Sequence, residues 1–169
     1  VIHRPFYLHP EKRRIFARCA QGSYRLWKDY ARAHGLPWKE VGTLEVAVDN
    51  LQLEHVHKYM DWAVRNGMEP DEVEYLSGTQ VKKLEPNVEC LGAIYAKTDA
   101  SVDYRVFTEF VKKDAAKQGV QFIFRYEVRN LEAGRDSVEI VSTDGRRIQA
   151  GFFINCAGGN GMDLAHKLG

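Results

Sequence analysis

The residue best suited to chemistry in this sequence is a histidine close to the amino terminus. His3 follows the strand-like pair Val1-Ile2. A neutral imidazole can accept or donate a proton in the physiological pH range, which suits a catalytic base or a polarising group. A histidine near a strand end can equally be a structural residue, and both interpretations stay open. We take His3 as the candidate catalytic residue.

A glycine-rich turn near the other end of the sequence is the second candidate. It lies in Gly151–Ala165, GFFINCAGGNGMDLA, where an apolar run leads into the turn and then into a helical pattern. Glycines let the main chain approach a ligand closely, and free N–H groups at a helix start attract phosphate. Glycine also forms the corner wherever a strand turns into a helix in an α/β domain. The turn is therefore either a phosphate cradle or a plain corner.

The sequence contains no spacing typical of a metal site. Cys19, Cys90 and Cys156 are odd in number and far apart, so they indicate neither a disulfide framework nor a CxxC pair. We expect Cys156 to pack as a small buried apolar residue. His55 and His57 are two residues apart in a predicted helix and face different sides, unlike the i, i+4 pair that binds zinc. No metal is expected, and a reducing compartment is the simplest interpretation.

Composition indicates an ordinary soluble globular protein. The 169 residues are 44% hydrophobic and 28% charged, with a formal net charge of +1, which suits one domain or pieces of two. The basic run Glu11–Arg18 is typical of the solvated face of a helix start. A nucleic-acid patch would need stacking aromatics and a second basic stripe, so no nucleic-acid partner is expected. No apolar run reaches the length of a membrane span, which predicts a cytoplasmic location, with attachment at a membrane periphery as the alternative.

The elements that position these residues follow from the spacing of apolar positions and from the turn residues between them. Helices are predicted over residues 11–34, 50–67, 77–86 and 103–119, with caps at Gly35, Asp49, Ser77 with Gln80, and Asp103. Strands are predicted over residues 39–48, 92–96, 120–124, 126–131, 137–143 and 147–152, the last continuing through 153–155.

Two styles of sheet are interleaved in this order of elements. The helix closed by Gly119 is followed directly by the apolar run Val120–Phe124, which is typical of a βαβ unit in a parallel sheet. The later strands are short and alternating, with turns at Ala133-Gly134 and Asp144-Gly145, as in an antiparallel meander. The sequence therefore predicts a mixed α/β and α+β fold.

Six segments resemble, in order, flavoproteins of the D-amino-acid-oxidase-like superfamily, and L-2-hydroxyglutarate dehydrogenases or oxidases most of all. They are VIH at 1–3, ARC at 17–19, HGLPW at 34–38, VGTLEVAVD at 41–49, SVDYRVFTEFVKKDAAKQG at 101–119 and FFINCAGG at 152–159. The segments are spread across nearly the whole chain. The missing initiator Met and the short final helical pattern lead us to expect an internal fragment of such a protein.

The resemblance implies a two-part architecture. Residues 1–38 and 103–169 would belong to an FAD-binding Rossmann-like domain that includes the β-meander, and residues 39–102 to an inserted antiparallel-sheet substrate domain with helices. The family's GxGxxG pyrophosphate motif does not occur in this sequence. We therefore expect that a protein made of these residues alone neither retains FAD nor catalyses the reaction.

The resemblance also implies an activity, the FAD-dependent oxidation of a small 2-hydroxy acid, L-2-hydroxyglutarate first, by hydride transfer to flavin. His3 would be the base or polariser, because its family counterpart lies close to the flavin ring. Relatives usually have small residues after this histidine. Arg4 would therefore change the approach to the flavin or offer a cation to a substrate carboxylate. Tyr7 and Tyr104 would hydrogen-bond the bound acid, or else simply pack with their hydroxyls at the surface.

For the cofactor, the resemblance implies main-chain contacts to the adenosine side of FAD from Val128, Ala157 and Gly158. The glycine turn would then border adenosine, and the pyrophosphate would bind elsewhere. Within the superfamily, an amino-acid or amine oxidase and a glycerol-3-phosphate dehydrogenase are the alternatives. A non-enzymatic α+β binding module is the alternative from another class. The electron acceptor stays open between oxygen and a quinone or electron-transfer protein.

Overall fold

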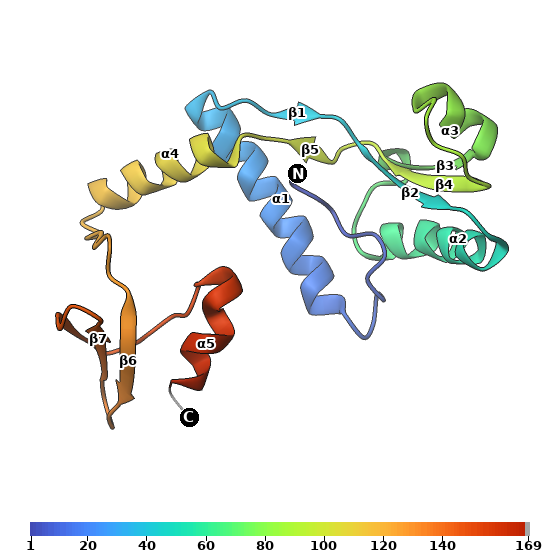
Figure 1. The fold of residues 1–169 in the computed structure, drawn as a ribbon. Coiled ribbons are helices and arrows are strands. Elements are labelled where there is room, and N and C mark those ends of the chain that lie inside the picture. The colour runs from blue at the N-terminus through green and yellow to red at the C-terminus, as the bar shows by residue number, and fades with distance from the viewer. Residues whose placement is uncertain (168–169) are drawn as a thin grey trace. The chain divides into compact units, whose positions relative to one another are not determined.

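The computed structural model describes residues 1–167, and the chain divides into two compact units, the first Val1–Asp114 and the second beginning at Ala115. Helices and antiparallel sheets are mixed in the fold, which confirms the predicted fold class (Figure 1). The division into FAD-domain and substrate-domain segments concerns the full-length protein and stays a prediction.

The longest helix is α1, Arg14–His34, and it belongs to the first unit. It begins three residues later than predicted because the His9 ring accepts hydrogen bonds from the main-chain N–H groups of residues 11 and 12 and holds them in a turn. Gly35 ends the helix in the left-handed conformation with φ 62°, as predicted. Ala31 and Leu36 then pack against Phe107 of α4, Tyr104–Lys117.

The main sheet of the first unit has the strand order β2-β4-β3, all antiparallel, with bounds Thr43–Ala47, Gly92–Ala96 and Val73–Ser77. Helix α2, Asn50–Arg65, covers one face, and the short helix α3, Gly78–Leu84, covers the other (Figure 1). The side chains of β4 alternate between the two faces, because successive residues of a strand point to opposite sides. The larger core, on the α2 side, comprises Phe6, Ala47, Val56, Ala63, Met68, Val73, Ile94 and Ala96.

Two predicted helix starts are confirmed by their caps. The Asp49 carboxylate accepts a hydrogen bond from Gln52 N at 2.8 Å at the start of α2. Ser77 and Gln80 form the predicted capping box at the start of α3. A side-chain oxygen at this position satisfies a main-chain N–H that the helix itself leaves unpaired. The 3₁₀ turn η1, Pro70–Glu72, leads into β3.

A second, two-stranded sheet ties the amino-terminal segment to the rest of the unit. It pairs β1, Lys39–Glu40, with β5, Ala100–Ser101, and Ile2 adds an antiparallel bridge to Ala100. The strand predicted over residues 39–48 is divided at Gly42, whose φ is 74° and whose N–H donates to the main-chain oxygen of Asp99 at 2.9 Å. The residues after Ile2 thereby lie next to Asp99.

The second unit contains the predicted meander. Its strands are β6, Val128–Ala133, β7, Val138–Ser142, and β8, Arg147–Ala150, paired in that order and antiparallel. The glycine turn follows as the 3₁₀ turn η2, Gly158–Asn160, and continues into the six-residue helix α5, Gly161–His166.

Two strand predictions in this unit are wrong. Residues 120–124 and 153–155 have no strand partner within residues 1–167, and no parallel pair forms among the described strands. Most of their large apolar side chains are exposed, as at Phe124 and Ile154. An apolar run becomes a strand only where a neighbouring strand accepts its main-chain hydrogen bonds, and the described chain provides none here.

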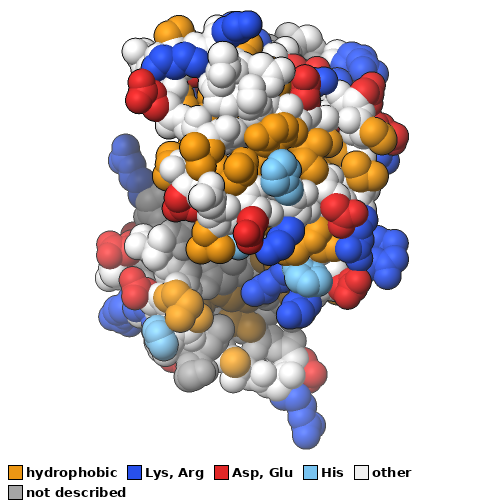
Figure 2. Space-filling view, turned by 90° about the vertical axis from the view of Figure 1, so that its right-hand side faces the viewer, with side chains coloured by type: hydrophobic (Ala, Val, Ile, Leu, Met, Phe, Trp, Pro, Cys, Tyr) orange, Lys and Arg blue, Asp and Glu red, His pale blue; other side chains and the backbone are white. Residues whose placement is uncertain are grey.

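The surface drawn in Figure 2 mixes basic, acidic and apolar side chains, and no large region of one charge covers this face. None of the helices formed by residues 1–167 is long and apolar enough to cross a membrane.

Candidate active site

The candidate site centres on a pair formed by His3 and a buried aspartate. His3 Nδ1 lies 2.6 Å from Asp99 Oδ2. The His3 side chain is 32% exposed and Asp99 is completely buried. Ninety-six residues separate them in sequence, and the bridge between Ile2 and Ala100 brings them together.

The main chain fixes the orientation of this aspartate. Arg4 N donates to Asp99 Oδ1 at 2.9 Å, so each carboxylate oxygen has its own donor. A carboxylate can only accept hydrogen bonds, so the hydrogen between the two side chains belongs to His3 Nδ1. The neutral imidazole then carries its lone pair on Nε2, which is the form a general base needs.

Aromatic rings hold the imidazole in place from two sides. The Tyr7 ring stacks on His3 with centroids 5.7 Å apart and an interplanar angle of 25°. Phe6, which is completely buried, meets His3 edge-on at 5.9 Å. Tyr7 is 40% exposed, so part of its side chain reaches solvent next to the histidine. The structure therefore brings two predicted site residues, His3 and Tyr7, side by side.

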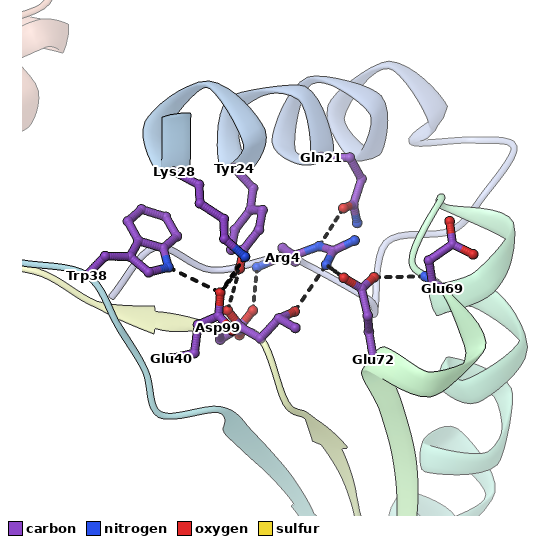
Figure 3. Close-up of polar contacts among 10 residues, drawn as sticks. Arg4, Gln21, Tyr24, Lys28, Trp38, Glu40, Glu69, Glu72 and Asp99 are labelled. Atoms are coloured by element: carbon purple, nitrogen blue, oxygen red, sulfur yellow. Dashed lines mark hydrogen bonds and ion pairs between the residues drawn. The ribbon is translucent and has the colours of Figure 1, made fainter. Parts of the chain in front are cut away.

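Arg4 lies beneath this surface, in a network of polar side chains (Figure 3). It is 3% exposed, and its guanidinium donates to Gln21 Oε1 at 2.6 Å and to Glu72 Oε1 at 2.5 Å. Thr98 accepts a further hydrogen bond at 3.1 Å, and the guanidinium lies over the Tyr24 ring, 4.8 Å from its centroid. All of these partners are protein groups, so Arg4 acts here as a structural cation. Its predicted role at a substrate carboxylate stays a prediction.

The acidic partner of Arg4 is held in its charged form. Burial alone would raise the pKa of Glu72, but the hydrogen bonds from Arg4 and from the main chain of Glu69 outweigh it and lower the pKa. This ion pair joins the amino-terminal segment to the turn before β3. It therefore stabilises the position of Arg4, whose N–H orients Asp99.

A second part of the network surrounds Tyr24 (Figure 3). Its hydroxyl donates to the main-chain oxygen of Thr98 at 2.7 Å and lies 3.2 Å from a Glu40 oxygen. Burial, with the Glu40 carboxylate nearby, raises the pKa of Tyr24 to about 12. The Lys28 ammonium, 2.7 Å from Glu40, is the main cause of the lowered pKa of that carboxylate. Tyr24 thus stays protonated and anchors α1 to the residue before Asp99.

Tyr104 lies apart from the histidine pair. Its hydroxyl donates to the main-chain oxygen of Val1 at 2.5 Å, and the side chain is 54% exposed. No contact within the described residues joins it to His3 or Tyr7. Asp103, next to it, accepts from the main-chain N–H groups of residues 105 and 106, which is the predicted helix cap. The substrate-binding role of Tyr104 stays a prediction.

The residues predicted to contact adenosine all lie in the second unit. Val128 begins β6 opposite Ser142 and is half-buried. Ala157 and Gly158 lie in the glycine turn, which the Asn155 side chain holds by accepting from Ala157 N and donating to the main-chain oxygen of Gly161. Because the two units are separate bodies, each set of site residues is described on its own.

The glycine turn fits a group that binds through the main chain. Gly158 has φ 57°, and a side-chain carbon at Gly158 or at Gly159 would meet nothing within 4 Å. The space beside these two glycines is therefore open, and a ligand that contacts the main chain needs such space. Cys156 is exposed beside this turn, so the expectation that it is buried is wrong. The reason is that its segment has no strand partner in the described chain.

Sequence reasoning missed Asp99. The only local signal is an acidic residue between an apolar strand and the SVDY segment, and nothing in that pattern indicates a partner near the amino terminus. For metals the outcome is simple: among residues 1–167, no cluster of three or more His, Cys, Asp or Glu could hold an ion.

The sequence matches the family of FAD dependent oxidoreductases over residues 1–169, and the chain belongs to that family. It is 27% identical over 169 residues to L-2-hydroxyglutarate dehydrogenase of Escherichia coli (strain K12), a match that covers 100% of this chain and 39% of that protein. It is also 27% identical over 135 residues to glycerol 3-phosphate dehydrogenase of Caloramator mitchellensis, covering 79% of this chain and 28% of the relative. This chain thus spans about two-fifths or less of the length of these relatives.

Among solved structures, the fold is similar to FAD-bound L-alpha-glycerophosphate oxidase from Mycoplasma pneumoniae. The TM-score is 0.80 at 19% sequence identity, and the match covers 99% of this chain and 44% of that one. The likeness confirms the fold of this family.

Proposed function

We propose that the full-length protein oxidises a small 2-hydroxy acid, with L-2-hydroxyglutarate as the first candidate substrate. The observation that carries the proposal is the His3–Asp99 pair, in which a buried carboxylate leaves the exposed imidazole with a free Nε2. Oxidation of a hydroxy acid needs a base for the hydroxyl proton, and an imidazole in this form is one. FAD, the cofactor of the family, supplies the hydride acceptor when bound.

Arg4, Tyr7 and the residues predicted at the adenosine side have a place in this proposal, and Tyr104 stays a predicted hydrogen-bond partner of the acid. In the proposal the Tyr7 hydroxyl donates a hydrogen bond to the bound acid, and the stacking of the Tyr7 ring on His3 supports this. Arg4 acts through Asp99, because its main-chain N–H fixes the carboxylate that orients the imidazole. The main chain at Val128, Ala157 and Gly158 borders the adenosine side of the cofactor, which the open glycine turn supports.

Anaerobic reduction of the flavin in the full-length protein tests this function. The expected result is a yellow protein that L-2-hydroxyglutarate bleaches, with bleaching at least 100-fold slower in His3→Gln because a general base contributes about 10²–10⁴-fold. The matched control is His55→Gln, which changes an exposed histidine on α2 and should keep the wild-type rate. A colourless protein that rejects added FAD would overturn the proposal.

The second candidate is a glycerol-3-phosphate dehydrogenase, which the similarity to the Caloramator mitchellensis enzyme favours. A substrate panel separates the two, with L-2-hydroxyglutarate, glycerol 3-phosphate and an amino acid added in turn to the oxidised protein. If glycerol 3-phosphate alone bleaches the flavin, it would take the place of the hydroxy acid as the proposed substrate.

The proposal leaves two properties to direct measurement. The electron acceptor is either oxygen or a quinone or electron-transfer protein. Comparing the rate at which air and a soluble quinone reoxidise the reduced flavin distinguishes them. The proposed location is the cytoplasm, and cell fractionation tests whether the protein sediments with membranes.

A further inference from the structure

A basic cavity lies between the outer side of α1 and the end of α2. Its volume is about 390 Å³, and four arginines line it: Arg14, Arg18 and Arg25 from α1, and Arg65 from α2. None of the residues assigned above to substrate or cofactor lines it. The cavity is large enough for a small molecule.

The three arginines of α1 form one stripe. They are four and seven residues apart, which places them on the same face of a helix. Like charges at this spacing destabilise a helix slightly, so the stripe does not arise from helix stability. Within residues 1–167, no ion pair involves Arg14, Arg18 or Arg25. The acidic groups nearby are Glu11 and Asp61, and both pair with Arg65 at the cavity rim.

Gly22 keeps the middle of the cavity open. It lies inside α1, where glycine costs about 1 kcal/mol relative to alanine. Its φ is not positive, and a side-chain carbon there would meet nothing within 4 Å, so neither conformation nor crowding requires glycine. A larger side chain at this position would project into the space between Arg18 and Arg25.

The wall of the cavity also carries a polar group with a missing partner. Gln21 is 6% exposed, and its Oε1 accepts from Arg4 Nε at 2.6 Å, which fixes the direction of the amide. Its Nε2 is buried and has no hydrogen-bond partner among the described residues. A buried donor without an acceptor is costly, and Gln21 is one of the residues that line this cavity.

We infer that this cavity binds a small anion with phosphate or carboxylate groups, at a site separate from the substrate. Arginine suits the role because its planar fork donates paired hydrogen bonds to such oxygens. A free phosphorylated or polycarboxylate molecule and the head group of an anionic lipid share this chemistry. The inference is independent of the proposed oxidation.

Titration calorimetry on the FAD-saturated full-length protein tests the site, with inorganic pyrophosphate as the probe. We expect saturable binding that weakens at least tenfold in the double variant Arg18→Gln with Arg25→Gln. Gly22→Leu, which fills the cavity without removing charge, should weaken it similarly. The matched controls are Arg32→Gln, an exposed arginine of α1 outside the cavity, and Gly22→Ala, which adds one methyl group; both should bind within twofold of wild type.

Vesicle sedimentation distinguishes the two sources of the anion. Sedimentation with phosphatidylglycerol vesicles but not with phosphatidylcholine vesicles, lost in the double variant and competed by pyrophosphate, identifies a lipid head group. Pyrophosphate binding without vesicle sedimentation identifies a free anion. Absence of pyrophosphate binding, or equal weakening in Arg32→Gln, would overturn the inference. Flavin reduction by substrate at the wild-type rate shows that each variant is folded. Loss of flavin reduction in the cavity variants would indicate that the cavity is part of the substrate site, and this result would also overturn the inference.

Discussion

Replacing Asp99 by asparagine tests the His3 pair most directly. One carboxylate oxygen accepts from the main-chain N–H of Arg4 at 2.9 Å and the other from His3 Nδ1 at 2.6 Å. A main-chain N–H can only donate, so the amide oxygen of the substituted side chain must face Arg4. The new NH₂ group then faces His3 Nδ1, which has to become the acceptor. The imidazole proton moves to Nε2, where the proposed base needs its lone pair.

The size of the effect follows from the two roles of the carboxylate. Loss of a general base lowers the rate by about 10²–10⁴-fold, so flavin reduction in Asp99→Asn should fall within that range. The free energy of unfolding should fall by about 1–3 kcal/mol, because a completely buried group exchanges a charge-assisted hydrogen bond for a weaker one. At room temperature most of the variant should therefore stay folded. Unfolding cannot then account for the fall in the rate of flavin reduction.

Stopped-flow reduction of the full-length holoprotein under anaerobic conditions measures the rate. At a single neutral pH, kcat/KM should fall by about 10²–10⁴-fold in Asp99→Asn relative to wild type. The control is Asp29→Asn, which makes the same chemical change at an exposed aspartate of α1. A rate within threefold of wild type in Asp99→Asn, or an equal loss of rate in Asp29→Asn, would refute the assignment of Asp99 as a positioning residue.

Three predictions concern stability, each measured by urea unfolding. The pKa of Glu72 is lowered in the folded protein. Its pairing with Arg4 therefore stabilises the fold at pH values above 4.5, the usual pKa of the group, and this stabilisation is lost as pH falls through the folded-state pKa. Glu72→Gln should therefore cost about 1–3 kcal/mol at neutral pH and progressively less as pH falls through the folded-state pKa. Ile94→Ala removes a completely buried side chain at the centre of the sheet and should cost about 2–5 kcal/mol. Gly42→Ala should cost about 1–3 kcal/mol, because φ is 74° and the new carbon would lie 2.3 Å from the Tyr95 ring. An unchanged urea midpoint in any one of these variants would contradict the prediction for that variant.

The helices were predictable because their signals are local. Asp49 and the Ser77–Gln80 pair lie within three residues of the N–H groups that they satisfy. The meander was predictable for the same reason, since the turn at Asp144-Gly145 directly joins β7 to β8, and Gly145 has φ 86°. The start of α1 was placed too early because the His9 ring competes for the N–H groups before it.

Only half of the candidate site could be predicted, and distance in sequence explains the rest. His3 and Tyr7 are four residues apart, and their types together with the family resemblance suggested a role. Asp99 is 96 residues from His3, and its position depends on β4, β5 and the bridge from Ile2 together. Arg4 shows what residue type alone leaves out: its charge suggested a ligand for an anion, and the structure adds that it is buried against Glu72 and Gln21, while its predicted role at a substrate carboxylate stays a prediction. Residue type indicates what a side chain can bind, and packing decides what it does bind.

The two runs that did not become strands show why an apolar pattern alone is insufficient. Phe124, Phe152 and Ile154 are 65%, 80% and 74% exposed, although their sequence is as strand-like as that of β4. β4 is buried because it has β2 on one side, β3 on the other and a helix on each face. The free energy of a strand comes from such neighbours, and burying each of these large side chains would contribute about 1.5–3 kcal/mol. Residues 120–124 and 152–155 therefore keep an unsatisfied preference for a sheet, which supports the prediction that they complete an FAD-binding domain in the full-length protein.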